Sequence, residues 1–271
     1  MALAGRYDAF LFDLDGVLYR ADSPVEHAAE AVGELRRRGR AVVFMTNNSS
    51  RTPAQVVERL EGVGVHAEPD EVVTSALVAA EVLRERRISE AFVIGEDGLL
   101  EALARAGIKV LDVDATQGEC VVVGWDRGIT YDKLRTAALL IQRGALLVAT
   151  NADPTYPAPD GLWPGAGSLL AAVVAATGAE PLVVGKPDPP LFEAACRRAG
   201  GGHPLVVGDR LDTDIEGAHA VGLPSLLVLT GISTREQARD ARVRPTYLGD
   251  DLRALFVDPE PLVAGAESAS Q

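Results

Sequence analysis

The sequence predicts a parallel α/β fold built from two domains. Short apolar segments alternate with amphipathic helices along most of the chain, which is the pattern of a parallel sheet covered by helices. The first strand, 9–12, is apolar without alternation, as expected for a strand that is buried on both faces. A chain of 271 residues is long enough for about two domains with a sizeable core.

The elements follow in order from turn and capping signals. Gly39 ends the first long helix, because glycine readily adopts the left-handed conformation that follows a helix. Thr52 and Gln55 frame Pro53 in a capping box that begins the next helix. A loop rich in Pro and Asp is expected over 151–164. The predicted elements are strands over 9–12, 40–45, 72–75, 91–95, 108–111, 120–124, 145–150, 182–185, 205–208 and 225–229, and helices over 24–38, from 53, 97–106, 131–142, 166–177 and from 189.

Composition excludes several classes of protein. The net charge of −13 argues against nucleic acid or an anionic membrane surface as the main partner. The two cysteines, Cys120 and Cys196, form neither a disulfide framework nor a CxxC zinc pattern. Carboxylates near the N-terminus do not fit a signal peptide, and no run of about 18 apolar residues occurs. A cytoplasmic protein without a membrane partner is therefore expected.

Reactive residues follow four of the predicted strands. Asp13, the run Thr46-Asn47-Asn48, Lys186 and Asp209 each stand where an apolar strand ends. Ligands of open parallel sheets bind outside the carboxyl ends of the strands. We therefore expect one site assembled from these four separated segments.

Asp13-Leu14-Asp15-Gly16 is the most informative of these segments. Two carboxylates at positions i and i+2 of an extended chain share a face, and their repulsion calls for a cation such as Mg²⁺. One carboxylate is suited to attack phosphorus, and the other to protonate a leaving alcohol and then activate water. A solvated acidic turn is the equally plausible alternative for this motif in isolation.

The other segments carry chemistry that fits the same site. Asp209 is placed as a third oxygen ligand and Asp214 as a residue that holds a metal-bound water. Lys186 would offset the negative charge of a phosphoryl group, although a surface lysine is the alternative. The Thr46 hydroxyl and the amide groups after it are suited to phosphate oxygens, although a polar turn would look the same.

Together, FDLDGVLY, TNNSSRTP, VVGKPDPPLF and VVGDRLDTDI resemble the four motifs of the haloacid dehalogenase-like hydrolase superfamily, subfamily IIA. That group includes p-nitrophenyl, pyridoxal-phosphate and glycerol-phosphate phosphatases and NagD-like nucleotidases. The resemblance covers about residues 6–255. It implies a Rossmann-like core and a cytoplasmic, Mg²⁺-dependent phosphatase acting on a small phosphorylated metabolite.

The resemblance also implies roles for individual residues. Asp13 would be the nucleophile, Asp15 the acid and base, and Lys186 would steady the phosphate. The phosphate-binding residues would be Thr46, Asn47, Asn48 and Lys186. The metal ligands would be Asp13, the backbone carbonyl of Asp15 and Asp209, with Asp214 bound through water.

The spacing of the motifs predicts where a second domain lies. The gap between Asp13 and Thr46 holds only a helix and a strand, whereas the gap between Thr46 and Lys186 is long enough for a domain. We expect a core over 1–79 and 181–271 and an inserted α/β cap over 80–180, and related caps often form homodimers. By resemblance, Trp125, Tyr156 and Pro157 of the cap would meet the substrate, although packing is the alternative for Trp125.

Several functions remain open at this stage. Glycerol 3-phosphate is the favoured substrate, because GDRLDTDIEGAHAVGLPSLLVLTG resembles actinobacterial glycerol-phosphate phosphatases. Pyridoxal phosphate and a nucleoside monophosphate are the alternatives. A dehalogenase would not need Asp15, and a phosphomutase usually carries its cap in the first gap. A phosphate-binding protein without catalysis is the alternative of another class.

Overall fold

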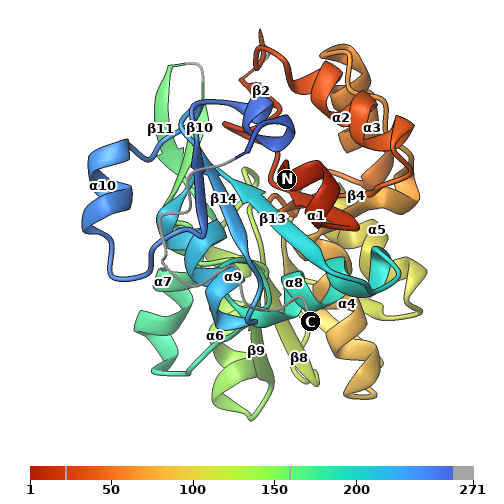
Figure 1. Ribbon diagram of the computed structural model, residues 1–271. Coiled ribbons are helices and arrows are strands. Elements are labelled where there is room, and N and C mark those ends of the chain that lie inside the picture. Colours follow the sequence, from red (N-terminus) through yellow and green to blue (C-terminus); the bar gives the residue numbers. More distant parts are fainter. Residues whose placement is uncertain (22, 159, 259–271) are drawn as a thin grey trace. The chain divides into compact units, whose positions relative to one another are not determined.

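The computed structural model describes residues 1–21, 23–158 and 160–258, and these divide into two compact units (Figure 1). The first unit comprises 1–45, 56–73 and the described residues from Lys186 onward, and the second comprises 46–55 and 74–185. Each unit contains its own sheet with parallel pairing, so the predicted α/β class is confirmed. Within the described part of the chain, no helix is long and apolar enough to cross a membrane.

The sheet of the first unit has the strand order β15-β14-β13-β1-β4-β5. Its middle strand, β1 (Ala9–Phe12), pairs in parallel with β13 (Pro204–Gly208) on one side and with β4 (Ala41–Thr46) on the other. All residues of β1 and β13 are buried, as the unbroken apolar sequence of β1 predicts. The remaining strands are β14 (Ser225–Val228) and the two edge strands, β5 (Val72–Thr74) and β15 (Tyr247–Gly249).

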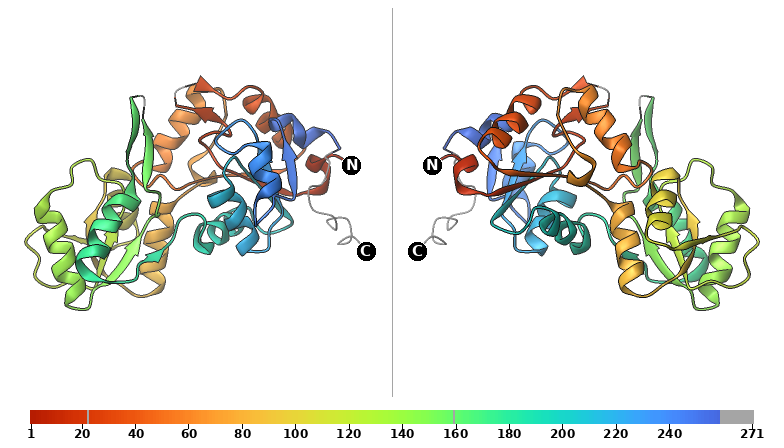
Figure 2. Two further views of the ribbon diagram at one scale, coloured as in Figure 1. Left: turned by 90° about the vertical axis from the view of Figure 1, so that its left-hand side faces the viewer. Right: turned by 90° about the vertical axis from the view of Figure 1, so that its right-hand side faces the viewer.

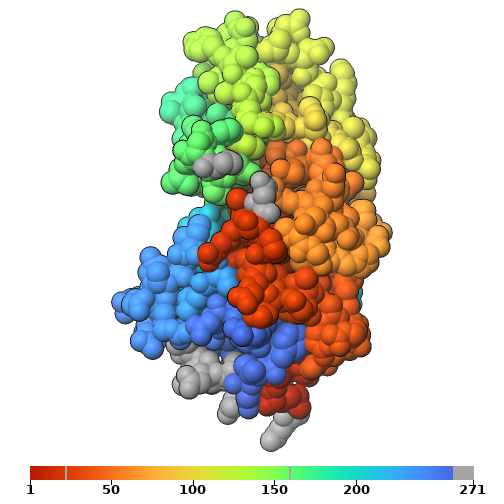
Figure 3. Space-filling view, turned by 90° about the horizontal axis from the view of Figure 1, so that it is seen from above, coloured from red at the N-terminus to blue at the C-terminus, as the bar shows by residue number. Residues whose placement is uncertain are grey.

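The two ends of the chain build the core of this unit together. Figure 3 shows the N-terminal residues, in red, beside the blue C-terminal ones. Phe10, Phe12 and Phe44 are fully buried in a cluster that also takes in Leu252 and Leu255. The helices and turns are α1 (Leu3–Arg6), α2 (Ala28–Arg37), α3 (Pro53–Gly62), η1 (Pro69–Glu71), α8 (Pro189–Arg198), η2 (Leu211–Ile215), α9 (Glu216–Ala220), α10 (Arg235–Asp240) and η3 (Leu252–Phe256), with a small ribbon of β2 (Tyr19–Arg20) and β3 (Ser23–Pro24).

The second unit has the strand order β12-β9-β8-β6-β7, all paired in parallel. Phe92, Val121 and Leu147 of its central strands pack against Leu140 and Leu170 of two helices. The strands are β6 (Glu90–Ile94), β7 (Lys109–Leu111), β8 (Cys120–Val123), β9 (Leu146–Ala149) and β12 (Leu182–Val183), and the helices are α4 (Ser75–Glu85), α5 (Asp97–Arg105), α6 (Tyr131–Gln142) and α7 (Ala166–Thr177).

The prediction of a loop over 151–164 is wrong. Residues 155–158 and 161–164 form the antiparallel strands β10 (Thr155–Ala158) and β11 (Gly161–Pro164), which project from the second unit as a hairpin (Figure 2). Tyr156 lies opposite Trp163 across the ribbon, and such aromatic pairs stabilise strand pairing. The prolines are tolerated because each strand of a two-stranded ribbon has an open edge.

Two further predictions require correction. The strand expected over 182–185 is β12, and it pairs with β9 in the sheet of the second unit rather than with the core strands. The helix expected over 24–38 begins only at Ala28, because β3 occupies its first residue and His27 has a left-handed backbone. In contrast, the capping box is confirmed, since the backbone amides of Thr52 and Gln55 each donate to the other's side chain, at 2.9 and 3.3 Å.

Candidate active site

The register of β1 against β13 brings two of the predicted residues together. Phe12 is paired with Val207, and the backbone amide of Asp13 donates to the carbonyl of Val207 at 2.9 Å. Asp13 and Asp209 therefore leave adjacent parallel strands at the same edge of the sheet. The chain continues from β1 to β4 on one side and reaches β13 on the other, which is the kind of switch point where α/β sheets bind ligands.

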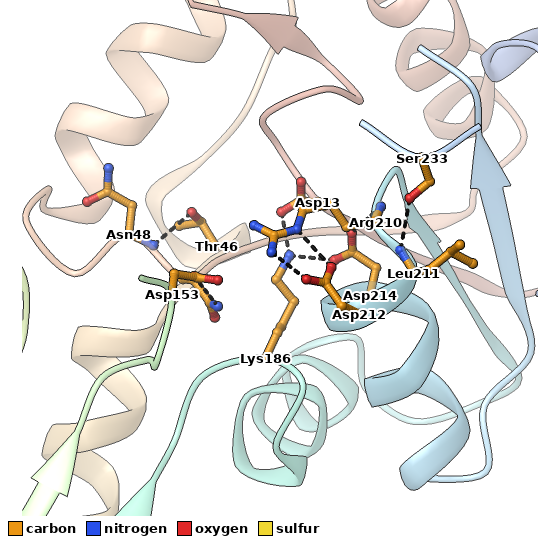
Figure 4. Close-up of polar contacts among 11 residues, drawn as sticks. Asp13, Thr46, Asn48, Asp153, Lys186, Arg210, Leu211, Asp212, Asp214 and Ser233 are labelled. Carbon is orange, nitrogen blue, oxygen red and sulfur yellow. Dashed lines mark hydrogen bonds and ion pairs between the residues drawn. The ribbon is translucent and has the colours of Figure 1, made fainter. Parts of the chain in front are cut away.

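Lys186 is buried among carboxylates of the first unit (Figure 4). Its ammonium donates to Oδ1 of Asp13 and, at 2.7 Å, to Oδ1 of Asp214. Lys186 is 4% exposed and Asp214 is fully buried. The reading of Lys186 as a surface lysine is therefore wrong, although the segment that carries it does not extend from a core strand.

The backbone at two glycines, Gly16 and Gly231, packs closely against the side chain of Asp209. A Cβ on Gly16 would lie 2.5 Å from Oδ2 of Asp209, and a Cβ on Gly231 would lie 1.8 Å from the same oxygen. Gly16 also has a φ of +82°, which an L side chain rarely adopts. The Thr230 hydroxyl donates to the carbonyl of Gly16 at 2.6 Å, which ties the turn after β1 to the turn after β14. No other residue type would fit at 16 and 231 without moving Asp209.

Charge is unbalanced in this cluster. The cluster holds three carboxyl groups and one ammonium, so full ionisation would leave two negative charges in excess within it. Burial raises the pKa of Asp13 well above its usual range, with Lys186 opposing and the charges of Asp214 and Asp209 adding to the rise. Burial, and then the charge of Asp214, raises the pKa of Asp209 to about 7. Burial lowers the pKa of Lys186, but its two carboxylate partners outweigh burial and raise it above the usual value.

The cluster fits a divalent cation. Among the described residues, Asp13, Asp209 and Asp214 offer carboxylate oxygens within 4.8 Å of one another. Oδ2 of Asp209 accepts from the backbone amide of Ile232 at 2.8 Å, whereas Oδ1 is buried and has no hydrogen-bond partner in the described part of the chain. A buried carboxylate oxygen without a partner is costly unless an ion or proton meets it. Hard oxygen donors and two excess negative charges match Mg²⁺.

The other motif residues are placed as follows. Asp15 is exposed and forms a bridge with Tyr19 in the turn after β1. Thr46 is the last residue of β4, and its hydroxyl accepts from the backbone amide of Asn48 at 3.1 Å. The Asn47 amide donates to Asp153 at 2.9 Å, and Oδ1 of Asn48 accepts from the backbone amide of Ser50 at 2.9 Å.

The three residues expected to meet the substrate, Trp125, Tyr156 and Pro157, all belong to the second unit. Trp125 follows β8 and stacks on Tyr156 of the hairpin, with ring centroids 4.2 Å apart and planes 24° apart. The Trp125 indole donates to the carbonyl of Pro164 at 3.0 Å, and the Arg127 guanidinium lies 5.2 Å from the centre of the Trp125 ring. The structure thus brings Trp125 and Tyr156 into contact, while Pro157 is exposed on β10.

Sequence reasoning missed two groups of residues around these sites. Thr230 and Gly231 follow a strand that was predicted, so the rule applied to the other strand ends would have found them. Asp153 begins a segment that resembles a ligand-contacting one, but no signal pointed to its bond with Asn47, because the two residues are 106 positions apart.

Replacing Asp209 with Asn should stabilise the metal-free protein at pH 8. Because the pKa of Asp209 is raised on folding, the folded state still holds a proton between about pH 4 and pH 7 that the unfolded state has released. The contribution of this group to the free energy of unfolding is therefore complete below about pH 4 and is lost as the pH rises past about 7. A neutral amide removes the charged buried group, so we expect a Tm that is higher by a few degrees at pH 8. The gain should shrink at pH 5.5.

Thermal melts in EDTA at both pH values would measure this effect. Asp212→Asn is the matched control, because Asp212 is exposed, pairs with Arg210 at 2.7 Å and should change Tm little. A lower Tm for Asp209→Asn at pH 8 would contradict the account of this charge.

Comparisons with known proteins identify the family of this chain. Residues 10–109 match the family described as Haloacid dehalogenase-like hydrolase, and residues 183–255 match a second family described as HAD-hydrolase-like. The chain is 40% identical to a D-glycerol 3-phosphate phosphatase of Mycobacterium tuberculosis, over all of this chain and 77% of that protein. It is 37% identical to the 5'-nucleotidase YutF of Bacillus subtilis, over 91% of this chain and 96% of that protein.

A solved structure extends the likeness to the fold. The crystal structure of glycerol phosphate phosphatase from Mycobacterium tuberculosis in complex with magnesium superposes with a TM-score of 0.89 at 41% identity, over 94% of this chain and 78% of that chain. On the strength of these matches, which run through all four motifs, the chain belongs to the haloacid dehalogenase-like hydrolase family.

Proposed function

We propose that this chain is a Mg²⁺-dependent phosphatase that hydrolyses small phosphomonoesters through an aspartyl-phosphate. The observation that carries the proposal is the buried cluster of three carboxyl groups, Asp13, Asp209 and Asp214, of which Asp13 and Asp214 bind the ammonium of Lys186. The names of the two relatives reported above, a phosphatase and a nucleotidase, support the same reaction class. This cluster stands at the switch point of the core sheet.

Asp13, the backbone carbonyl of Asp15 and Asp209 would hold the magnesium ion, with Asp214 bound through water. When bound, the ion supplies positive charge that offsets the carboxylates and the phosphoryl oxygens. The rigid placement of Asp209 between Gly16 and Gly231 suits this role, because a ligand held by packing needs little reorganisation when the ion binds.

The protein residues carry the two steps of the reaction. A carboxylate oxygen of Asp13 attacks phosphorus, the bond to the leaving oxygen breaks, and Asp15 gives that oxygen a proton. Asp15, now a carboxylate, takes a proton from water, whose oxygen attacks phosphorus and releases the carboxylate of Asp13. Lys186 remains protonated throughout and steadies the negative charge of Asp13 and of the phosphoryl group.

Other segments would bind the phosphate and select the leaving group. We assign phosphate binding to Thr46, Asn47, Asn48 and Lys186, and we propose that an inserted domain over 80–180 acts as the cap. In this proposal Trp125, Tyr156 and Pro157 meet the substrate. The stacking of Trp125 on Tyr156 supports a shared role for these two rings.

The substrate we favour is glycerol 3-phosphate, because a relative of that name matches the whole length of this chain. A nucleoside monophosphate is the second candidate, supported by the named nucleotidase and by the aromatic stack, which suits a planar base. Pyridoxal phosphate stays a prediction, as do the cytoplasmic location and a homodimer through the cap, which light scattering would test.

Phosphate release from a panel of about thirty phosphomonoesters, with Mg²⁺ and again with EDTA, tests the proposal. We expect release that requires Mg²⁺, with one ester dominating kcat/KM. The panel includes glycerol 3-phosphate, nucleoside monophosphates, pyridoxal 5'-phosphate and p-nitrophenyl phosphate. Release of phosphate from none of them would reject a phosphatase and favour a phosphate-binding protein, a mutase or a dehalogenase.

Replacing Asp13 with Asn should abolish turnover, because an amide oxygen is a poor nucleophile. We expect kcat on p-nitrophenyl phosphate to fall by about a thousandfold or more. The Tm should stay near the wild-type value, because Asn has the same shape and Asp214 still holds Lys186. Asp212→Asn serves as the control, and turnover retained by Asp13→Asn would exclude Asp13 as the nucleophile.

Replacing Trp125 with Ala should change the relative kcat/KM values across the panel more than it changes activity on p-nitrophenyl phosphate. The control is Trp163→Ala, which removes an indole that is 39% exposed on the same hairpin that carries Tyr156. If Trp125→Ala lowers activity on every ester by the same factor, Trp125 only packs against Tyr156.

A further inference from the structure

The segment after β4 belongs to the second unit and is bonded into it at several points. We call residues 46–50 the β4 loop. The Asn47 carbonyl accepts from the Ser75 hydroxyl and from the Asn151 side chain, both at 2.7 Å. The Ser50 carbonyl accepts from the backbone amide of Gly98 at 3.0 Å. The β4 loop is therefore fixed by three separate segments of the second unit.

The side chain of Asn47 is fixed as well. Its amide nitrogen donates to Oδ2 of Asp153 at 2.9 Å, and the backbone amide of Asp153 donates to Oδ1 of Asn151 at 3.0 Å. Gly185 permits this arrangement, because a Cβ there would lie 2.6 Å from Oδ1 of Asn47. Contacts to both the carbonyl and the side chain leave Asn47 little freedom to rotate.

The backbone at Asp153 is itself held by hydrogen bonds from the start of α7. Its carbonyl accepts from the backbone amide of Gly167 at 2.8 Å, in the first turn of α7. The next residue, Pro154, accepts from the backbone amide of Gly165 at 2.9 Å and from the Ser168 hydroxyl at 2.7 Å. Asp153 therefore joins the β4 loop to the start of the hairpin β10–β11, and α7 holds it in place.

We propose that Asp153 is a positioning residue for phosphate binding, acting through Asn47. Asp153 orients the Asn47 side chain, and Asn151 and Ser75 orient its carbonyl, so that the β4 loop is already arranged when phosphate arrives. This inference rests on the proposed function, in which Asn47 binds the phosphoryl group. It adds that the same residue links the phosphate-binding loop to the hairpin that carries Tyr156.

A double-mutant cycle on Asn47 and Asp153 tests the proposal. The variants are Asp153→Ala, Asn47→Ala and the double variant, with Asp153→Asn as the conservative replacement that keeps an acceptor oxygen. The measurements are kcat and KM for p-nitrophenyl phosphate with Mg²⁺, the inhibition constant of inorganic phosphate, and Tm. Asp132→Ala is the control, because Asp132 is exposed on α6 and pairs only locally with Arg135 among the contacts described.

We expect Asp153→Ala to raise both KM and the inhibition constant of phosphate about tenfold, the effect of one hydrogen bond to a charged group. Asp153→Asn should remain within about threefold of the wild type. In the Asn47→Ala background, removal of Asp153 should change either constant less than twofold. A purely structural role would instead lower Tm and kcat with equal losses in both backgrounds.

The outcomes separate the proposals. If the wild type releases no phosphate, the proposed function fails and the role of Asp153 with it. If the wild type is active and Asp153→Ala leaves the inhibition constant unchanged, or changes it equally in both backgrounds, only the positioning role is overturned. Should Asp153→Ala not fold, Ser75→Ala removes the bond to the Asn47 carbonyl, and an unchanged inhibition constant there would equally overturn the proposal.

Discussion

The contact of Lys186 with Asp13 and Asp214 is the interaction on which the site depends. A buried ammonium needs a carboxylate partner, because an uncompensated charge is costly in a dry environment, and Asp13 and Asp214 both supply one. Asp209 lies nearby, and burial, reinforced by the neighbouring carboxylates, raises the pKa values of Asp13 and Asp209. The site is therefore prepared for a divalent cation and for an anionic substrate brought with it.

The sheet explains how such a cluster forms from distant parts of the chain. Asp13 and Asp209 extend from adjacent parallel strands, so the β1–β13 register alone determines their separation. Lys186 does not extend from a strand of this sheet. It follows β12, which belongs to the sheet of the second unit. The β4 loop, with Asn47, is likewise part of that unit. Lys186 and Asn47 thus belong to different units.

Much of this could be predicted from the sequence. The buried strand before Asp13 and the helices over 131–142 and 166–177 were predictable from unbroken apolar runs and from helical periodicity. The pairing of β12 with β9 could not be predicted, because an apolar run indicates that a strand is buried but does not indicate which strand it pairs with. The hairpin over 155–164 was hidden by its prolines, since the pattern of cross-strand contacts that stabilises it is not local.

Some features of the candidate site could also be predicted from the sequence, and others could not. The motifs predicted Asp13 and Asp209 as neighbours, because strand ends meet at one edge of a parallel sheet, whereas Lys186 follows a strand of the other sheet. The close packing of Gly231 against Asp209 could not be predicted, because it depends on how nearly two distant segments approach each other. The hydrogen bond between Asn47 and Asp153 likewise depends on a tertiary contact between two loops. Such contacts follow from the fold rather than from any local signal.

The central claim is that Asp13 carries the phosphoryl group during the reaction. The most direct test mixes the enzyme with Mg²⁺ and radiolabelled p-nitrophenyl phosphate, stops the reaction with acid within the first turnover, and maps the protein-bound label by peptide digestion. The account predicts a hydroxylamine-labile label, at most one per chain, on the peptide that contains Asp13. Release of phosphate with no protein-bound label, or with the label on a different residue, would contradict it.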